Sequence, residues 1–92
     1  YPASKRDLSF SLRDISVLGD IEDIIYSFRN DILKEVFVFD FFENTKNNEV
    51  KIGFRFLFQS NQRTITDIEV DSVMKDIVDI STANDSIQIP GL

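Results

Sequence analysis

The segment from Val50 to Gln59 limits most strongly what this chain can fold into. Apolar residues occupy every second position in it, namely Val50, Ile52, Phe54, Phe56 and Phe58, and the positions between them are mostly polar. Because successive side chains of a β-strand point to opposite faces, the pattern predicts a strand with one fully buried face. Its three phenylalanines are therefore predicted to be core residues, each stabilising the fold by about 1.5–3 kcal/mol.

The remaining elements follow from the same kind of spacing. Alternating apolar residues predict strands, and apolar residues three and four positions apart predict helices. In chain order the predicted elements are a strand in 6–14, a helix over 17–30, strands over 36–42 and 50–59, a helix over 67–82 and a strand over 86–89. This βαββαβ order, with right-handed crossovers, predicts a ferredoxin-like α+β fold, in which a four-stranded antiparallel sheet carries both helices on one face. The other face of the sheet is left open.

The second helix has a distinct start signal. Thr66 has the side chain of an N-cap residue, and Glu69 three positions later is placed to bond back to the Thr66 N–H, which is the capping box. Ile65 and Val70 have the spacing of a hydrophobic staple across the same turn. The sequence therefore predicts a helix that begins at Asp67.

The strand predicted over 36–42 has apolar residues on both faces. One alternating set contains Val36 and Val38, and the other contains Phe37, Phe39 and Phe41. We assign the valines to the core and Phe37 and Phe39 to the open face. Asp40 shares the face of the valines only if the strand stays regular, because a β-bulge would reverse every position after it.

The composition excludes several kinds of site. The 92 residues carry a net charge of −6 and contain no cysteine and no histidine, so thiolate and imidazole chemistry is absent. No phosphate-binding Gly-rich loop or metal-ligand cluster is visible, and we expect no catalytic residue and no metal site. No apolar run reaches the roughly 20 residues of a membrane span, so we expect a cytoplasmic protein without membrane contact. Because the chain begins at Tyr1 without an initiator methionine, we expect residues 1–92 to be one domain excised from a longer protein.

Three motifs in order resemble one family. "YPASKRDLSF", "LKEVFVFDFF" and "QRTITDIEVD" are similar to the opening, the second strand and the second helix start of the ferredoxin-fold anticodon-binding domain. That domain lies at the C-terminus of phenylalanyl-tRNA synthetase, in bacteria at the end of the β subunit. The resemblance implies a non-catalytic, tRNA-binding domain that supports charging of tRNA(Phe) with phenylalanine. The implied partners are the tRNA(Phe) anticodon stem-loop, the rest of the β subunit and the α subunit, and the ATP and magnesium of the parent would bind elsewhere.

The resemblance also implies a role for Asp40. In the family, the aspartate that ends the second strand contacts the first anticodon base, a guanine. A carboxylate can accept hydrogen bonds from N1–H and N2–H of guanine together, and adenine and the pyrimidines do not offer this pair of donors. The alternative is a strand-end aspartate that accepts hydrogen bonds from nearby backbone N–H groups.

Other residues are implied on the same open face. The serine with which the family commonly opens its third strand is replaced here by Lys51, which with Arg55 is predicted to contact phosphate, or else to be an ordinary solvated charge. The complete set of predicted tRNA-binding residues is Asp40, Lys51, Arg55, Arg13, Phe39, Ser9 and Ser11. Arg6 is a further open-face candidate, unless it pins the strand start together with Asp7. For Arg63 we predict a structural role in the loop before the second helix rather than an RNA contact.

Two other classes of domain remain open. An RNA-recognition motif shares the fold, and "IGFRFLF" loosely matches its third-strand pattern, but that module needs Phe54 and Phe56 exposed for base stacking. A regulatory or structural ferredoxin-like domain that binds a protein or a small ligand would suit the acidic net charge. The first class requires Phe54 and Phe56 on the open face, so the face that they occupy tests it. Whether Lys51, Arg55, Arg13 and Asp40 converge on one surface tests the second class.

Overall fold

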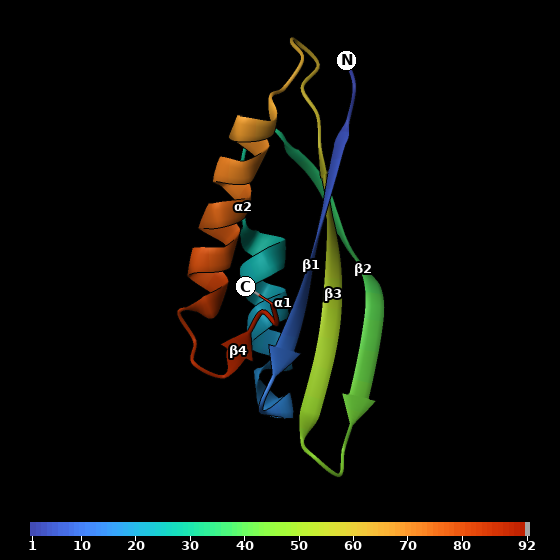
Figure 1. Ribbon diagram of the computed structural model, residues 1–92, viewed down its shortest axis with the longest axis vertical. Helices are drawn as coiled ribbons and strands as arrows, with labels where there is room; N and C mark the ends of the chain where they lie inside the picture. The colour runs from blue at the N-terminus through green and yellow to red at the C-terminus, as the bar shows by residue number, and fades with distance from the viewer. Residues whose placement is uncertain (92) are drawn as a thin grey trace.

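The computed structural model describes residues 1–91 and has the predicted order of elements. The elements are β1 (Ser4–Leu12), a 3₁₀ turn η1 (Ile15–Val17), α1 (Leu18–Ser27), β2 (Leu33–Asn44), β3 (Glu49–Phe58), α2 (Asp67–Thr82) and β4 (Ile87–Gln88). The strands form one sheet in the order β2-β3-β1-β4, and every neighbouring pair is antiparallel. Both helices lie on one side of this sheet (Figure 1). The ferredoxin-like α+β prediction is therefore confirmed.

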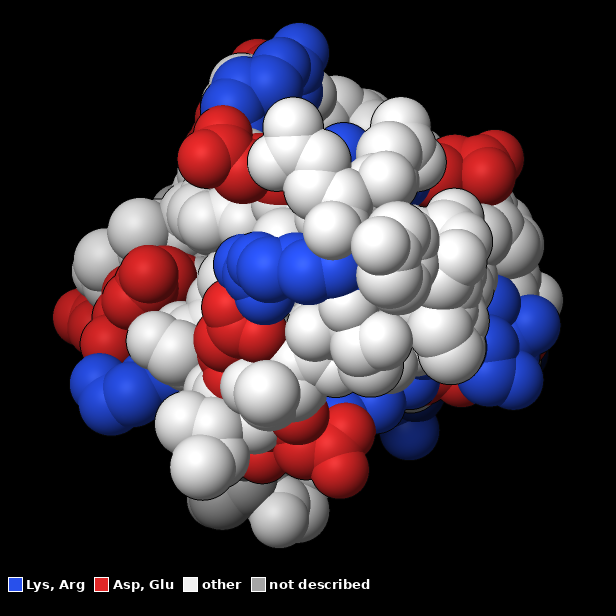
Figure 2. Space-filling model, turned by 90° about the horizontal axis from the view of Figure 1, so that it is seen from above, with Lys and Arg blue, Asp and Glu red and all other residues white. Residues whose placement is uncertain are grey.

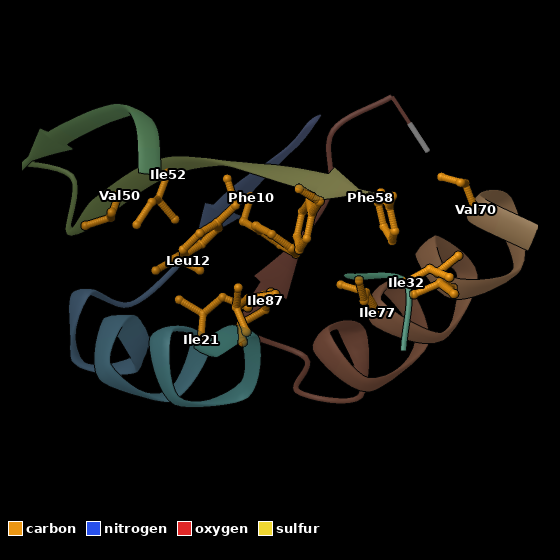
Figure 3. Close-up of a cluster of buried hydrophobic side chains, with 14 of the residues drawn as sticks. Phe10, Leu12, Ile21, Ile32, Val50, Ile52, Phe58, Val70, Ile77 and Ile87 are labelled. Carbon is orange, nitrogen blue, oxygen red and sulfur yellow. The ribbon is translucent and has the colours of Figure 1, made fainter. Parts of the chain in front are cut away.

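The core lies between the sheet and the helices (Figure 3). The alternating apolar set of β3 is buried throughout, and Phe54 and Phe56 are 0% and 1% exposed. The Phe54 ring meets the rings of Phe10 and Tyr26 edge to face, with centroid separations of 5.9 Å and 5.8 Å. Such pairs add to the energy of burial. The prediction that these phenylalanines are core residues is confirmed.

Helix α2 begins where its cap predicts. The Thr66 side chain accepts from the Glu69 N–H, and the Glu69 carboxylate accepts from the Thr66 N–H. By contrast, α1 ends at Ser27, three residues earlier than predicted, because Phe28 has an extended backbone. The 3₁₀ turn η1 leads directly into α1, and Asp14 caps this turn by accepting from the Ser16 N–H.

Strand β2 is longer than predicted and irregular. Its pairing with β3 shifts between Leu33 and Glu35 and again between Val38 and Asp40, so that Lys34 and Phe39 are extra residues in the ladder. The second bulge changes the faces that follow it. Val38 pairs with the core residue Phe54, but Asp40 pairs with Gly53, which belongs to the alternate set of β3. Asp40 is therefore on the open face, whereas an unbroken strand would turn it toward the helices.

The bulge also separates the phenylalanines of β2. Phe41 pairs with the core residue Ile52 and so points to the helix side, where it is 48% exposed, and Phe42 pairs with Lys51 on the open face. Val36 and Val38 lie on the helix side and Phe37 on the open face, as assigned, but Val38 is 36% exposed and is therefore not the core residue that the sequence predicts. In Figure 1 the hairpin that joins β2 and β3 extends beyond the helices, and β2 is an edge strand of the sheet, so its helix-side residues have a neighbouring strand on one side only. No helix within residues 1–91 is long and apolar enough to cross a membrane.

Candidate nucleic-acid interface

The register of the central strands assembles the candidate site row by row on the open face. In one row Ser11, Lys51 and Phe42 lie side by side on β1, β3 and β2. The next row consists of Ser9, Gly53 and Asp40, and the row after that of Asp7, Arg55 and Phe37. Directly opposite residues on antiparallel strands have Cβ atoms about 4.5–5.5 Å apart. Five of the seven predicted residues, Ser9, Ser11, Asp40, Lys51 and Arg55, thus share one surface.

Phe39 joins this surface although it stands outside the ladder. A Cβ atom placed on Gly53 would lie 2.9 Å from Cε1 and Cζ of Phe39 and 3.3 Å from the Asp40 Cβ. The ring and the carboxylate of consecutive residues are therefore both on the open side of Gly53. In a regular strand they would point to opposite faces, so the bulge is what brings them together.

The Asp40 carboxylate is exposed and free to accept hydrogen bonds. It takes part in none of the side-chain hydrogen bonds or ion pairs found within residues 1–91. The alternative role, in which Asp40 caps nearby backbone N–H groups, is not the arrangement in the structure. An unpaired carboxylate at the edge of an aromatic ring has the chemistry to read donor groups of a ligand.

Arg55 is held in place by Asp7, which the sequence suggests only as a partner of Arg6. Its Nε and Nη2 donate to Oδ1 and Oδ2 of Asp7 at 2.9 Å and 3.0 Å, and its Cζ lies 4.7 Å from the centroid of the Phe39 ring. The hydrogen bonds from Arg55 lower the pKa of Asp7 below its usual value, so the pair stays charged at neutral pH. The signal for Asp7 was the pairing register of β1 with β3, which the sequence does not display.

The other candidates differ in their surroundings. Lys51 and Ser9 are exposed and Ser11 is half-buried. Arg13 follows directly after β1, at the end of the sheet where Ser11 and Lys51 lie, and its backbone N–H donates to the Ser86 carbonyl while its side chain is exposed. Arg13 is thus near the surface formed by the strands without being part of its ladder.

Two arginines lie elsewhere. The expectation that Arg6 belongs to the open face is wrong, since it pairs with the core residue Phe56 and points to the helix side. There its guanidinium lies 3.4 Å from Asp67 and 3.7 Å from Asp71 of α2. Arg63 forms an ion pair with the Glu69 carboxylate at 2.7 Å, in agreement with the predicted structural role, although we expected nearby backbone carbonyls as its partners.

The charges are mixed over the surface. Figure 2, which views one end of the molecule from above, shows basic and acidic side chains beside one another on that end. On the open face Lys5, Lys51 and Arg55 alternate with Asp7, Glu35 and Asp40. This arrangement does not favour indiscriminate polyanion binding, which needs clustered Lys and Arg. Within residues 1–91 no group of side chains could hold a metal ion.

The burial of the β3 rings separates the remaining classes of domain. Because Phe54 and Phe56 are in the core, they cannot stack bases, and the RNA-recognition-motif interpretation is wrong. What remains is a ferredoxin-like α+β domain that presents an open sheet face with a free carboxylate beside an aromatic ring. The sequence comparisons define it further.

The chain belongs to the ferredoxin-fold anticodon-binding domain family, whose model matches residues 1–88. It is 42% identical over 77 residues to the phenylalanine–tRNA ligase beta subunit of Francisella tularensis, an alignment that covers 82% of this chain and 10% of that protein. It is 34% identical over 80 residues to the beta subunit of Bacteroides fragilis, with 85% and 10% covered. A probable mitochondrial phenylalanine–tRNA ligase of Drosophila melanogaster is 30% identical over 95 aligned positions, with 97% and 21% covered.

The chain thus spans a tenth to a fifth of the length of these relatives. The domain of this family is a non-catalytic region of phenylalanine–tRNA ligase. Anticodon binding is accordingly the role of the family to which the chain belongs.

Proposed function

We propose that this domain binds the anticodon stem-loop of tRNA(Phe) with its open sheet face and thereby supports aminoacylation of that tRNA. The observation that carries the proposal is the position of Asp40, which the bulge in β2 turns onto the open face beside Phe39. Among residues 1–91 its carboxylate has no hydrogen-bond or ion-pair partner. Unpaired loop bases are the usual targets of sequence-specific RNA recognition, through stacking on aromatic rings and hydrogen bonds to base edges. The Asp40 surface offers both.

In this proposal Asp40 reads the first anticodon base. Its two oxygens accept from N1–H and N2–H of guanine, whereas adenine and the pyrimidines do not present these two donors together. Lys51 lies one row away on β3 and supplies a phosphate contact, which positions the loop without reading sequence. Ser9, Ser11 and Arg13 border the same surface and contribute polar groups to the RNA backbone.

The remaining predictions concern the longer protein. Residues 1–92 are proposed to be one domain of a synthetase whose other parts, including an α subunit, bind ATP and magnesium and catalyse the reaction. A cytoplasmic location stays a prediction that the bacterial relatives support, whereas other relatives are named as mitochondrial or chloroplastic.

Binding is tested by fluorescence anisotropy with a labelled tRNA(Phe) anticodon stem-loop. The domain is expected to bind weakly, and more weakly as salt is added, because phosphate contacts release counterions. Replacing the first anticodon guanine by inosine removes N2–H, and replacing it by adenine also removes N1–H, so affinity should fall in that order. Asp40→Ala should lower affinity for the guanine loop by about 10- to 100-fold, as for charge-assisted hydrogen bonds, and should not lower affinity for the adenine loop.

Glu43→Ala is the matched control. Glu43 is an exposed acid of the same strand, but it pairs with the core residue Val50 and so belongs to the helix side. Both variants remove one negative charge from β2. Equal effects of the two variants on the guanine loop would contradict a reading role for Asp40. If the wild-type domain fails to bind at low salt while the complete synthetase needs it for charging, the domain acts indirectly.

A further inference from the structure

Four residues from three strands fit together on the open face. They are Asp7 of β1, Phe39 in the bulge of β2, and Gly53 and Arg55 of β3. The Phe39 ring lies over Gly53, and the Arg55 guanidinium lies over the ring and is fixed at its other side by Asp7. Of this group only Phe39 and Arg55 are among the residues that the sequence predicts to bind tRNA, so the structure raises the question of what Asp7 and Gly53 do.

Gly53 provides the space in which the ring lies. The backbone φ of Gly53 is not positive, so the backbone conformation alone would allow a residue with a side chain there. A Cβ would however lie 2.9 Å from two ring carbons, well inside the roughly 3.5–4.0 Å of ordinary carbon contacts. Glycine in the interior of a strand lowers stability. Its presence here is explained by the close approach of Phe39.

Asp7 determines where the guanidinium lies. An arginine side chain has many rotamers, and ordering it on binding costs affinity. The two hydrogen bonds from Nε and Nη2 to the Asp7 carboxylate fix the plane of the Arg55 guanidinium before any ligand binds. Nη1 stays outside this pair and keeps its donors for a phosphate or a base. The Arg55 side chain is 29% exposed and Phe39 is 40% exposed, so the stacked pair remains accessible.

We propose that Asp7 and Gly53 are positioning residues that hold Phe39 and Arg55 as a preformed stacking platform for one unpaired RNA base beside Asp40. The proposal rests on the proposed function and names the subsite within it. A planar base gains affinity from stacking on an aromatic ring or a guanidinium plane. Because Asp40 and Phe39 both border Gly53, a base on this platform has its edge toward the Asp40 carboxylate.

The experiment compares Asp7→Asn and Gly53→Ala with two matched controls. Asp79→Asn removes the same charge from another surface ion pair, that of Lys75 with Asp79 on α2. Gly19→Ala adds the same methyl group where no atom lies within 4 Å. The platform is monitored without RNA by the NMR signal of the Arg55 Nε–H, which the Phe39 ring shifts in the wild type. Asp7→Asn and Gly53→Ala should move this signal toward its random-coil position, and the controls should not.

Two RNA probes separate this proposal from the proposed function. One is the anticodon stem-loop. The other is a single-stranded RNA hexamer that lacks the anticodon sequence and carries 2-aminopurine at its centre. The fluorescence of 2-aminopurine is quenched when the base stacks on another group. Asp7→Asn and Gly53→Ala should each weaken binding of both probes by about fivefold or more, which corresponds to the low end of the energy of base stacking. The thermal stability of the Asp7→Asn variant should be unchanged.

If the stem-loop binds the wild type and both variants equally well, the platform is wrong and the proposed function stands. If the hexamer fluorescence is quenched by stacking on Phe39, but the stem-loop binds no more tightly than the hexamer, the platform stands and the anticodon function is wrong. If neither probe binds, both are overturned.

Discussion

The opposite faces of the phenylalanines on β3 and β2 lead to a quantitative prediction for Phe54→Ala and Phe42→Ala. Phe54 is fully buried and makes two edge-to-face ring contacts, so its removal loses transfer energy and leaves a cavity, at a cost of about 3–5 kcal/mol. Phe42 keeps 52% of its surface exposed in the folded state. Half of the roughly 1.5–3 kcal/mol for a fully buried phenylalanine is about 1 kcal/mol. The loss in unfolding free energy should therefore be about three times larger for Phe54→Ala.

Urea unfolding followed by circular dichroism measures this difference. The midpoint for Phe54→Ala should fall by about 1 M or more, since small proteins lose about 1–3 kcal/mol of stability per molar urea. A domain of this size has only about 5–15 kcal/mol of stability, so Phe54→Leu and Phe42→Leu provide a milder pair with the same expected ranking. Midpoint shifts of equal size, or a larger shift for Phe42, would refute the assignment of the β3 rings to the core.

Three further outcomes are expected. Thr66→Ala removes the N-cap of α2 and should lower the unfolding free energy by about 1 kcal/mol, seen as a lower Tm; an unchanged Tm would contradict the cap. Hydrogen bonds from Arg63 and from the Thr66 N–H lower the pKa of Glu69 from 4.5 to about 2. The charged Glu69 therefore stabilises the fold fully above pH 4.5, and this stabilisation is lost as the pH falls to about 2. The difference in unfolding free energy between wild type and Glu69→Gln should close over that range. Ile68 is 82% exposed, so Ile68→Lys should change stability by no more than about 0.5 kcal/mol, and a larger loss in urea unfolding would contradict its exposure.

Much of the fold was predictable because local and long-range signals agree. The start of α2 follows from a cap that needs only two residues three positions apart, and the β3 faces follow from an unbroken alternation. Arg6 shows the limit of this reasoning. It shares its face with Leu8 by simple alternation, yet its charge suggested the open side, and the structure resolves this by pairing it with the acids of α2.

The site was less predictable because it depends on register. Asp40, Phe39 and Lys51 could be named from the motifs, but whether they share a face depends on a bulge that the apolar residues on both sides of β2 conceal. Asp7 is separated from Arg55 by 48 positions in the chain, and its role becomes visible only when β1 is aligned with β3. Sequence patterns report periodicity within an element, whereas contacts between elements require the pairing itself.

The bulge at Phe39 has a consequence for how this domain can diverge. Substitutions at Val38 or Phe41 leave the side of the sheet on which Asp40 stands unchanged, since each keeps the number of residues between the paired positions. Loss of the bulge at constant length would pair Phe39 with Gly53 and turn Asp40 toward the helices, whereas deletion of the extra residue would leave Asp40 opposite Gly53 on the open face. The bulge and the length of this segment are therefore coupled, and a related domain with a regular second strand should keep its aspartate on the open face only if this segment is one residue shorter or longer.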